Sequence, residues 1–333
     1  MSKILDPARE IVDPHHHLWP NGRREPYTLA ELHEDLCSGH DIVQTVFVEC
    51  GASYRSDGPA HLRPVGETAW VAAAARASAS GGGPEIAGIV SFADLSSGGL
   101  LPEVLDAHEA AGEGRFRGIR HALARGDHRP GTEHDPGPAR AGLAHEVQFQ
   151  AGVRLLGKRG LTWESWHYHY QMADFIAVAK SAPDTICVLD HFGTPLGVGR
   201  YREQREEIFA QSKRDMAAAA ALPNVVAKLG GMAMADNGFG WDKREQPVTA
   251  EEFAAAQREY YLHAIDCFGT GRCMLESNFP VEKVSVSYRV LYNAFKLITA
   301  GFSEPEKDAL FSGTARRVYR LPPASRASRG LPH

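Results

Sequence analysis

The sequence has 333 residues, with 36 Lys and Arg against 41 Asp and Glu, which gives a formal net charge of -5 at pH 7. This length fits two domains or one large α/β barrel. The mild acidity disfavours a nucleic-acid-binding surface, and no apolar run approaches the length of a membrane span. Five scattered cysteines without a CxxC pair are typical of reduced thiols, so we expect a cytoplasmic protein.

Short β-branched runs alternate with longer amphipathic or alanine-rich stretches along the chain. The strand candidates are Ile11–Asp13, Thr45–Cys50, Ile86–Phe92, Phe116–Ala122, Leu161–Trp166, Thr185–His191, Val225–Leu229 and Cys273–Ser277. The helix candidates are Ala30–Leu36, Glu67–Ser78, Leu101–Ala111, Gly142–Leu156, Met172–Ser181, Glu203–Ala221, Ala250–Phe268 and Val284–Thr299. Eight strands, each followed by a helix, predict a single α/β domain, a (β/α)8 TIM barrel over residues 1–320, with a tail at 321–333.

A doubly wound sheet is the alternative architecture. It would normally place a glycine-rich phosphate-binding turn after the first strand, where this chain has HHHLW. Two long segments, Arg125–Arg140 and Gly231–Val248, follow the fourth and seventh predicted strands. In a barrel they would lie on the C-terminal face, where active sites are built, and long loops there are usually functional.

Three consecutive histidines, His15 to His17, follow the first predicted strand. Alternate side chains of an extended segment share a face, so His15 and His17 point the same way and His16 points away. Two imidazoles placed so can bind one divalent cation or orient a reacting carbonyl. A surface polyhistidine patch is the alternative, but the run is internal and is flanked by apolar residues.

Further histidines follow the fifth and sixth predicted strands. His191 ends a buried run before Gly and Pro, and it is either a site residue or a structural histidine bonded to Asp190. The segment WHYHYQ offers His167 and His169, of which we expect only one to face the site. A packed aromatic cluster is the alternative there.

Charged residues end several other strands. Arg120, followed by His121, ends strand four, where an arginine can bind a substrate carboxylate bidentately. Glu49 ends strand two and Lys228 ends strand seven. Each is a candidate for substrate binding, with a structural ion pair as the alternative.

At the end of strand eight, Glu276 and Asn278 share a face by their two-residue spacing. If the active site lies at the C-terminal ends of the barrel strands, we expect a carboxylate at this position. Asn cannot act as a base, although its carbonyl can coordinate a hard cation. The remaining histidines are interpreted mostly as surface positions: His33, His40, His61, His108, His128, His134, His145, His263 and His333.

The HxH pair, the LDHFGTP segment and the SNFP segment occur in an order that resembles the amidohydrolase superfamily. The most similar branch is the amidohydrolase-2 group, which contains sugar lactonases and 2-pyrone-4,6-dicarboxylate lactonase. The resemblance implies a barrel in which His15 and His17 bind a metal with His169, and His191 is the strand-six histidine. The usual SDWP of strand eight is here Ser277-Asn278-Phe279-Pro280, so the expected general base is an amide.

The resemblance makes lactone hydrolysis the leading expectation, with water attacking the ring carbonyl of a small carboxylated or hydroxylated lactone. The missing carboxylate leaves four alternatives: Glu276 or a histidine is the base, a metal hydroxide removes the need for one, or hydrolysis has been lost. A metal-dependent decarboxylase of an aromatic or unsaturated acid is the alternative, and a non-catalytic binding protein is a third. Histidine-rich sites favour Zn²⁺. We expect a small-molecule substrate, with no nucleic acid or membrane partner, and a homo-oligomer remains open.

Overall fold

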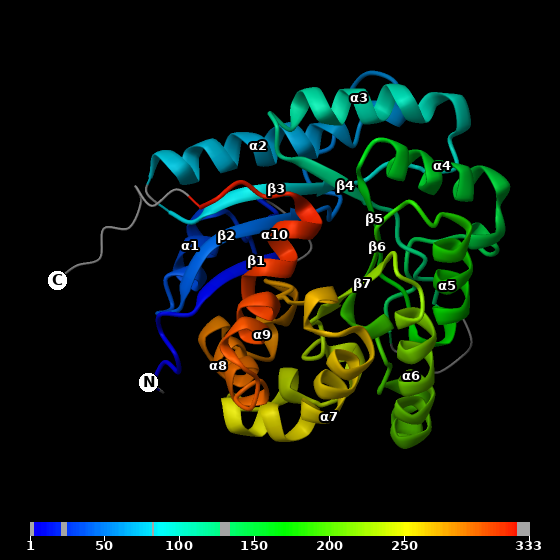
Figure 1. The fold of residues 1–333 in the computed structure, drawn as a ribbon. Helices are drawn as coiled ribbons and strands as arrows, with labels where there is room; N and C mark the ends of the chain where they lie inside the picture. Colours follow the sequence, from blue (N-terminus) through cyan, green and yellow to red (C-terminus); the bar gives the residue numbers. More distant parts are fainter. Residues whose placement is uncertain (1–2, 21–24, 82, 127–133, 325–333) are drawn as a thin grey trace.

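A computed structural model describes residues 3–20, 25–81, 83–126 and 134–324. Its eight parallel strands are hydrogen-bonded in chain order. They are β1 (Glu10–His16), β2 (Asp41–Val48), β3 (Glu85–Ser91), β4 (Phe116–Arg120), β5 (Thr162–Ser165), β6 (Cys187–Leu189), β7 (Val225–Leu229) and β8 (Cys273–Leu275). A parallel bridge between His16 and Phe279 brings the segment after β8 beside β1. The predicted (β/α)8 barrel is therefore confirmed (Figure 1).

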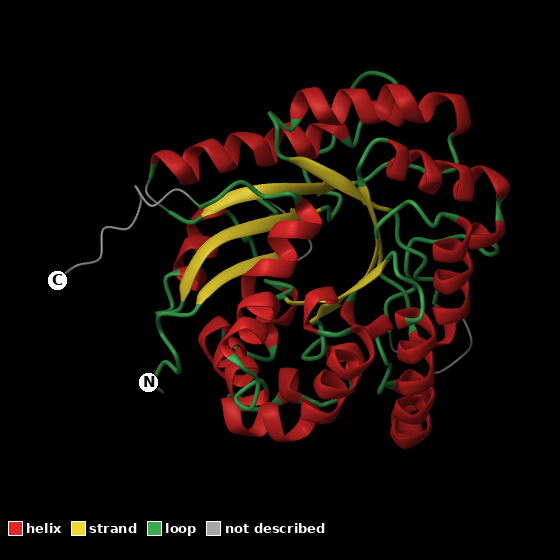
Figure 2. Ribbon diagram, viewed as in Figure 1, coloured by secondary structure: helices red, strands yellow, loops and turns green. Residues whose placement is uncertain are grey.

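Helices surround the strands on the outside (Figure 2). They are α1 (Leu29–Leu36), α2 (Val65–Ser80), α3 (Leu101–Ala111), α4 (Val147–Lys158), α5 (Met172–Ser181), α6 (Arg205–Ala220), α7 (Ala250–Phe268), α8 (Tyr288–Ile298), α9 (Glu304–Asp308) and α10 (Thr314–Tyr319). The helix predicted to start at Gly142 begins five residues later, because Leu143–His145 form a separate 3₁₀ turn and Glu146 is extended. Among the described residues, no helix combines the length and hydropathy needed to cross a bilayer.

The sequence did not predict α9 and α10, and α10 closes one end of the barrel. Its residues Ala315, Val318 and Tyr319 pack with inward-facing strand residues such as Val12 and Val226. In Figure 1 this helix lies in front of the barrel. Two partly buried residues near the strand starts, Val43 in the first half of β2 and Ile186 just before β6, pack against the same cluster. Helix α10 therefore covers the N-terminal end, so the opposite end remains for a site.

A one-residue irregularity in β1 determines which histidines face inward. Val12 belongs to the interior cluster, so strict alternation would turn His16 inward. Between Asp13 and His16 the register shifts: three steps along β1 correspond to two steps along β2. Pro14 lies at this shift, where its missing N–H removes a hydrogen bond of the ladder. The extra residue turns the histidines at 15 and 17 into the barrel.

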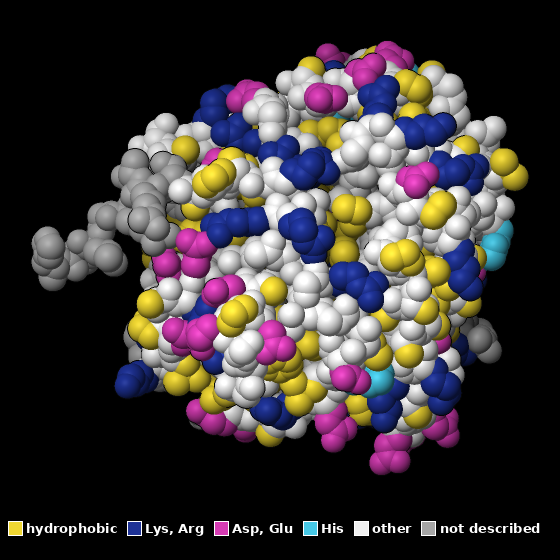
Figure 3. Space-filling model, viewed as in Figure 1, with side chains coloured by type: hydrophobic (Ala, Val, Ile, Leu, Met, Phe, Trp, Pro, Cys, Tyr) yellow, Lys and Arg dark blue, Asp and Glu magenta, His cyan; other side chains and the backbone are white. Residues whose placement is uncertain are grey.

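Several histidines that we expected on the surface are buried. His40, His108 and His134 are 7%, 0% and 7% exposed, because their rings pack within the protein. The face drawn in Figure 3 carries Lys and Arg interspersed with Asp and Glu. His128 and His333 lie outside the described residues, as do 127–133 of the first long loop and 325–333 of the predicted tail.

The packing of α10 against the N-terminal end of the barrel can be tested with two Val→Ala substitutions. Val318 is fully buried, so Val318→Ala should lower the free energy of unfolding by about 2 kcal/mol through lost burial and a cavity. Val147, 76% exposed at the start of α4, is the matched control. Val147→Ala should change stability by less than about 0.5 kcal/mol. Urea denaturation measures the free energy of unfolding of both variants. Equal losses would contradict the packing of α10 against the end of the barrel.

Candidate active site

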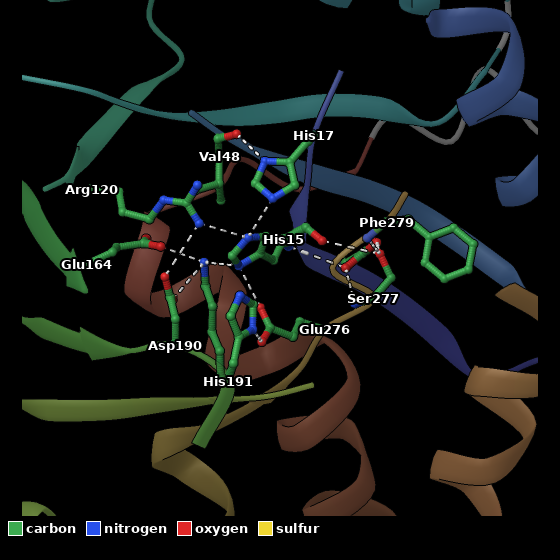
Figure 4. Close-up of polar contacts among 12 residues, drawn as sticks. His15, His17, Val48, Arg120, Glu164, Asp190, His191, Glu276, Ser277 and Phe279 are labelled. Carbon is green, nitrogen blue, oxygen red and sulfur yellow. Dashed lines mark hydrogen bonds and ion pairs between the residues drawn. The ribbon is translucent and has the colours of Figure 1, made fainter. Parts of the chain in front are cut away.

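Polar side chains from seven strands, or from the turns directly after them, meet inside the barrel (Figure 4). The set is joined by short polar contacts, and nearly all of its members are buried. It consists of His15 and His17 from β1 and its end, Glu49 after β2, Arg120 from β4, Glu164 from β5, Asp190 and His191 after β6, Lys228 from β7 and Glu276 after β8.

The imidazoles of His15 and His17 face one another, with their Nε2 atoms 3.3 Å apart. Nδ1 of His17 donates a hydrogen bond to the carbonyl oxygen of Val48 at 2.7 Å, so Nε2 of His17 carries the lone pair. Burial lowers the pKa of both histidines well below the usual value, so both are neutral. Two nitrogens on one tetrahedral Zn²⁺, each about 2.0–2.1 Å from it, lie roughly 3.3 Å apart. The pair therefore fits a divalent metal.

Glu276 links the imidazoles of His15 and His191. Its Oε1 lies 2.6 Å from Nδ1 of His191, and its Oε2 lies 2.7 Å from Nδ1 of His15. The carboxyl group is fully buried, and burial raises its pKa well above the usual value. Oε1 is hydrogen-bonded to His191, whereas Oε2 faces His15 without a hydrogen bond among the described residues. Carboxylate–histidine pairs of this kind orient metal ligands. The geometry fits a positioning role better than the general-base role predicted for Glu276.

Lys228 places an ammonium group among acidic partners in the barrel interior. Its Nζ donates to Oε2 of Glu164 at 2.6 Å and lies 3.8 Å from Oδ1 of Asp190 and 3.3 Å from Nδ1 of His15. Although burial lowers the pKa of Lys228, the charges of Glu164 and Asp190 raise it, with a net upward shift. The other oxygen of Glu164 accepts from Tyr319 of α10 at 2.5 Å.

Arg120 is held at the mouth of the cluster by Glu49. Its Nε donates to Oε1 of Glu49 at 2.7 Å, and a second nitrogen donates to the carbonyl oxygen of the same residue. The remaining nitrogen lies 3.4 Å from Nε2 of His15 and 3.9 Å from Asp190. Because Glu49 occupies most of the guanidinium fork, Arg120 presents one donor inward instead of a bidentate pair.

No described residue donates a hydrogen bond to either carboxylate oxygen of Asp190, although this side chain is fully buried. Burial raises the pKa of Asp190 to about 6. Within the described part of the chain, ligand atoms of His15, Asp190 and His191 lie within 4.8 Å of one another, a spacing that could hold a metal ion.

The charge balance supports this interpretation. Four carboxyl groups (Glu49, Glu164, Asp190 and Glu276) face the two cations of Arg120 and Lys228, so ionising all four would leave two negative charges. Burial raises the pKa of Glu276 well above its usual value and that of Asp190 to about 6, so without a further cation these two groups hold protons more readily than free carboxyl groups do. Buried charge of one sign is costly unless it is compensated. One divalent cation would balance it, so the residues fit such an ion in charge as well as in ligand type.

Glycines after β7 leave room for these rings. A Cβ on Gly230 would lie 2.4 Å from Cγ of Glu276, and a Cβ on Gly231 would lie 2.5 Å from the ring of His191. His191 itself has φ 54°, in the left-handed region, which turns its ring into the site directly after Asp190. Larger residues at either glycine would therefore displace the site's own side chains.

Asp13 joins β1 to the end of β8. Its buried carboxylate accepts hydrogen bonds from the N–H and hydroxyl of Ser277, at 2.9 and 2.6 Å, and from Tyr288 at 3.0 Å. The N–H of Asn278 donates to the carbonyl oxygen of His15 at 2.9 Å. Asn278 is 1% exposed with φ 54°, and its Nδ2 has no hydrogen-bond partner. Asn278 thus carries an unpartnered donor two residues beyond Glu276.

Two predicted site residues lie elsewhere. Successive strand residues face opposite sides, so with Arg120 inward, His121 points outward and packs between Phe92 and Phe149. His169, predicted as a metal ligand, packs on Tyr170 and Tyr201, and its Nδ1 accepts from an N–H after β6. Neither residue hydrogen-bonds to the cluster.

The other histidine of that segment, His167, also lies outside the cluster. It contacts Ser165 and Met172, with its ring stacked on Phe175. The fifth strand thus contributes Glu164 instead of a histidine. His16, as predicted, points away from His15 and His17 and contacts Thr45.

Two residues of the cluster were missed in the sequence. Glu164 is a charged residue between Trp163 and Ser165 in a fully buried strand. Asp190 is two residues beyond Val188, which faces the interior. The alternation of inward and outward residues along a strand could have identified both residues. A carboxylate at an inward position of a buried strand needs a polar partner inside the barrel.

The amidohydrolase family model matches residues 12–321, so the chain belongs to the amidohydrolase family, whose members are enzymes. It is 30% identical over 334 residues to the uncharacterised protein y4mH of Sinorhizobium fredii, covering 93% of this chain and 98% of that one. It is 27% identical over 246 residues to L-fucono-1,5-lactonase of Burkholderia multivorans, covering 71% and 72%. The crystal structure of a B. multivorans amidohydrolase with bound zinc has a similar fold, with a TM-score of 0.72, 23% identity and coverage of 94% and 99%.

The space reserved for His191 can be tested with two glycine substitutions. Gly231 and Gly240 have similar positive φ angles, 74° and 70°, but a Cβ on Gly240 would meet nothing within 4 Å. Both Ala variants carry the same backbone strain of about 1 kcal/mol, and only Gly231→Ala should displace the ring of His191. Crystal structures of both variants measure this. If the ring of His191 keeps its position in Gly231→Ala, the absence of a side chain at residue 231 is not what leaves space for that ring.

The burial of His167 predicts a specific pH dependence of stability. Burial lowers its pKa to about 3, so between pH 7 and 5 the unfolded chain binds a proton that the folded chain does not. This histidine therefore destabilises the wild type as the pH falls, by about 2 kcal/mol over that range. The free energy of unfolding of the wild type minus that of His167→Gln should fall by this amount between pH 7 and pH 5. Urea denaturation of both proteins at the two pH values measures this difference. A constant difference would show that His167 is not held neutral.

Proposed function

We propose that this protein is a lactonase that opens a small hydroxylated lactone by attack of water on the ring carbonyl. The observation that carries the proposal is Asp190, a buried carboxylate with no hydrogen bond to either oxygen, beside neutral His15 and His191. Such a group has a free acceptor for the proton of an attacking water. Similarity to L-fucono-1,5-lactonase supports a lactone as the substrate.

His15 and His17 would hold a divalent cation, with zinc the first choice because a similarly folded amidohydrolase contains it. The bound cation would polarise the lactone carbonyl or lower the pKa of a water molecule. Glu276 orients the rings of His15 and His191, and Lys228 and Arg120 keep Asp190 close to positive charge. These contacts fix the direction in which each acceptor points.

Asp190 takes the proton from water as the oxygen attacks the carbonyl carbon. The ester bond to the ring oxygen then breaks, and the proton passes to that oxygen, which leaves as a hydroxyl group. The product is a hydroxy acid, which releases a proton near neutral pH. Glu276 is less suited to this role because both of its oxygens already face imidazole nitrogens.

Arg120 favours a hydroxylated substrate over a carboxylated one. The guanidinium nitrogen that faces His15 and Asp190 can donate to the negative charge that develops on the carbonyl oxygen. A substrate carboxylate would need two parallel donors, but Glu49 occupies them.

A pH-indicator assay tests this function. Purified protein loaded with Zn²⁺ should release acid from six-membered sugar lactones such as L-fucono-1,5-lactone, and much less from a dicarboxylated pyrone lactone. Asp190→Asn should lower kcat by roughly 10²–10⁴-fold, because a general base contributes that much. Asp184→Asn, an exposed aspartate just before β6, is the matched control and should keep wild-type activity.

Two results would contradict the proposal. If folded, metal-loaded protein opens none of the lactones, the substrate class is wrong. If Asp190→Asn turns over as fast as the wild type, Asp190 is not the base, whatever the substrate.

A further inference from the structure

We propose that the ammonium group of Lys228 occupies the position of a second metal ion, so that this site binds one divalent cation and excludes another. The proposal concerns the site of the proposed lactonase and rests on its single bound cation, but it does not depend on which substrate is hydrolysed. It follows from what surrounds the ammonium nitrogen inside the barrel.

Two carboxylates converge on Nζ of Lys228, one from β5 and one from the turn after β6. The distances are 2.6 Å to Oε2 of Glu164 and 3.8 Å to Oδ1 of Asp190. Nδ1 of His15 lies 3.3 Å from the same nitrogen, but it faces Oε2 of Glu276 at 2.7 Å and is not counted as a ligand. Lys228, Glu164 and Asp190 are fully buried. Paired carboxylates are usual ligands of divalent metal ions. In this chain the same groups surround an ammonium ion.

Glu164 is oriented as a ligating carboxylate would be. One oxygen accepts from Lys228, and the other accepts from the hydroxyl of Tyr319, on the helix that closes the barrel. Second partners of this kind fix the direction of carboxylates that bind metals. Residue 164 is therefore held towards the ammonium position by a group that would remain if the ammonium were removed.

Electrostatics explains how Lys228 would exclude a second ion. A divalent cation between Glu164 and Asp190 would lie within a few ångströms of the ammonium charge in a buried site, where repulsion between like charges is strong. The ammonium already supplies one positive charge to Glu164 and Asp190. A single divalent ion held near His15 and His17 would balance the two further negative charges that the cluster carries when all of its carboxyl groups are ionised.

Metal content per chain tests the proposal. Wild type, Lys228→Met and Lys296→Met are saturated with ZnCl2, desalted and measured by elemental analysis. Lys228→Met removes the ammonium and keeps an unbranched chain, so it should bind one more zinc ion per chain than the wild type. Lys296→Met is the matched control, because Lys296 is also buried but its Nζ contacts a backbone carbonyl and His40 instead of carboxylates. It should bind the same number of ions as the wild type.

A second substitution locates the extra ion. Adding Glu164→Gln to Lys228→Met removes the carboxylate that faces the emptied position, so the zinc content should return to the wild-type number. Circular dichroism confirms that each variant is folded. If Lys228→Met does not fold, titration of the wild type decides, since saturation at one ion supports the proposal and binding of two inside the barrel overturns it.

Folded Lys228→Met with the zinc content of the wild type would also overturn the proposal. Failure of the proposed function is recognised separately. If lactones are not hydrolysed but Lys228→Met gains an ion, the lactonase assignment is wrong and the role of Lys228 stands. If the wild type binds no zinc, the single-cation site on which this inference rests is absent and the inference is overturned, whereas ring opening by that metal-free protein would leave the lactonase assignment standing.

Discussion

The carboxylate of Glu276, placed between Nδ1 of His15 and Nδ1 of His191, is the contact on which the rest of the site depends. A buried carboxylate persists only where polar partners compensate its desolvation, and here the partners are rings that must also face the substrate. The neighbouring structure accommodates this contact. Gly230 and Gly231 leave the space that the glutamate and the ring of His191 fill. The contact thereby ties β1, β6 and β8 into one constellation.

The charges inside the barrel form a second constraint. Lys228 and Arg120 approach the cluster from different strands, yet both lie nearly 4 Å from the oxygens of Asp190 without a hydrogen bond to them. A carboxylate that is close to cations but unbonded keeps its acceptor sites open for water. The same positive groups limit how much further charge the site accepts. The positions of Lys228 and Arg120 beside Asp190 therefore bear both on the acceptor sites of this carboxylate and on the number of metal ions that the site can hold.

The sequence predicted the barrel because buried β-branched runs and amphipathic helices alternate along it, and strand spacing correctly paired His15 with His17. It failed where the outcome depends on local geometry. His121 is adjacent to Arg120 but faces the opposite side of the sheet, where it packs on aromatic rings. His169 lies in an aromatic cluster, which was the competing interpretation of its segment. The use of Glu276 could not be read from its position, because both of its partners are distant in sequence.

The protonation of the imidazoles tests the central claim most directly. At pH 7, long-range ¹H–¹⁵N spectra of histidine-labelled protein distinguish the two neutral tautomers and the imidazolium, with His17→Gln and His191→Gln used for assignment. The contacts of His17 with the carbonyl of Val48 and of His191 with Glu276 predict neutral rings protonated at Nδ1, with Nε2 unprotonated. Rings protonated at Nε2, or imidazolium forms, would contradict a site in which these nitrogens serve as acceptors.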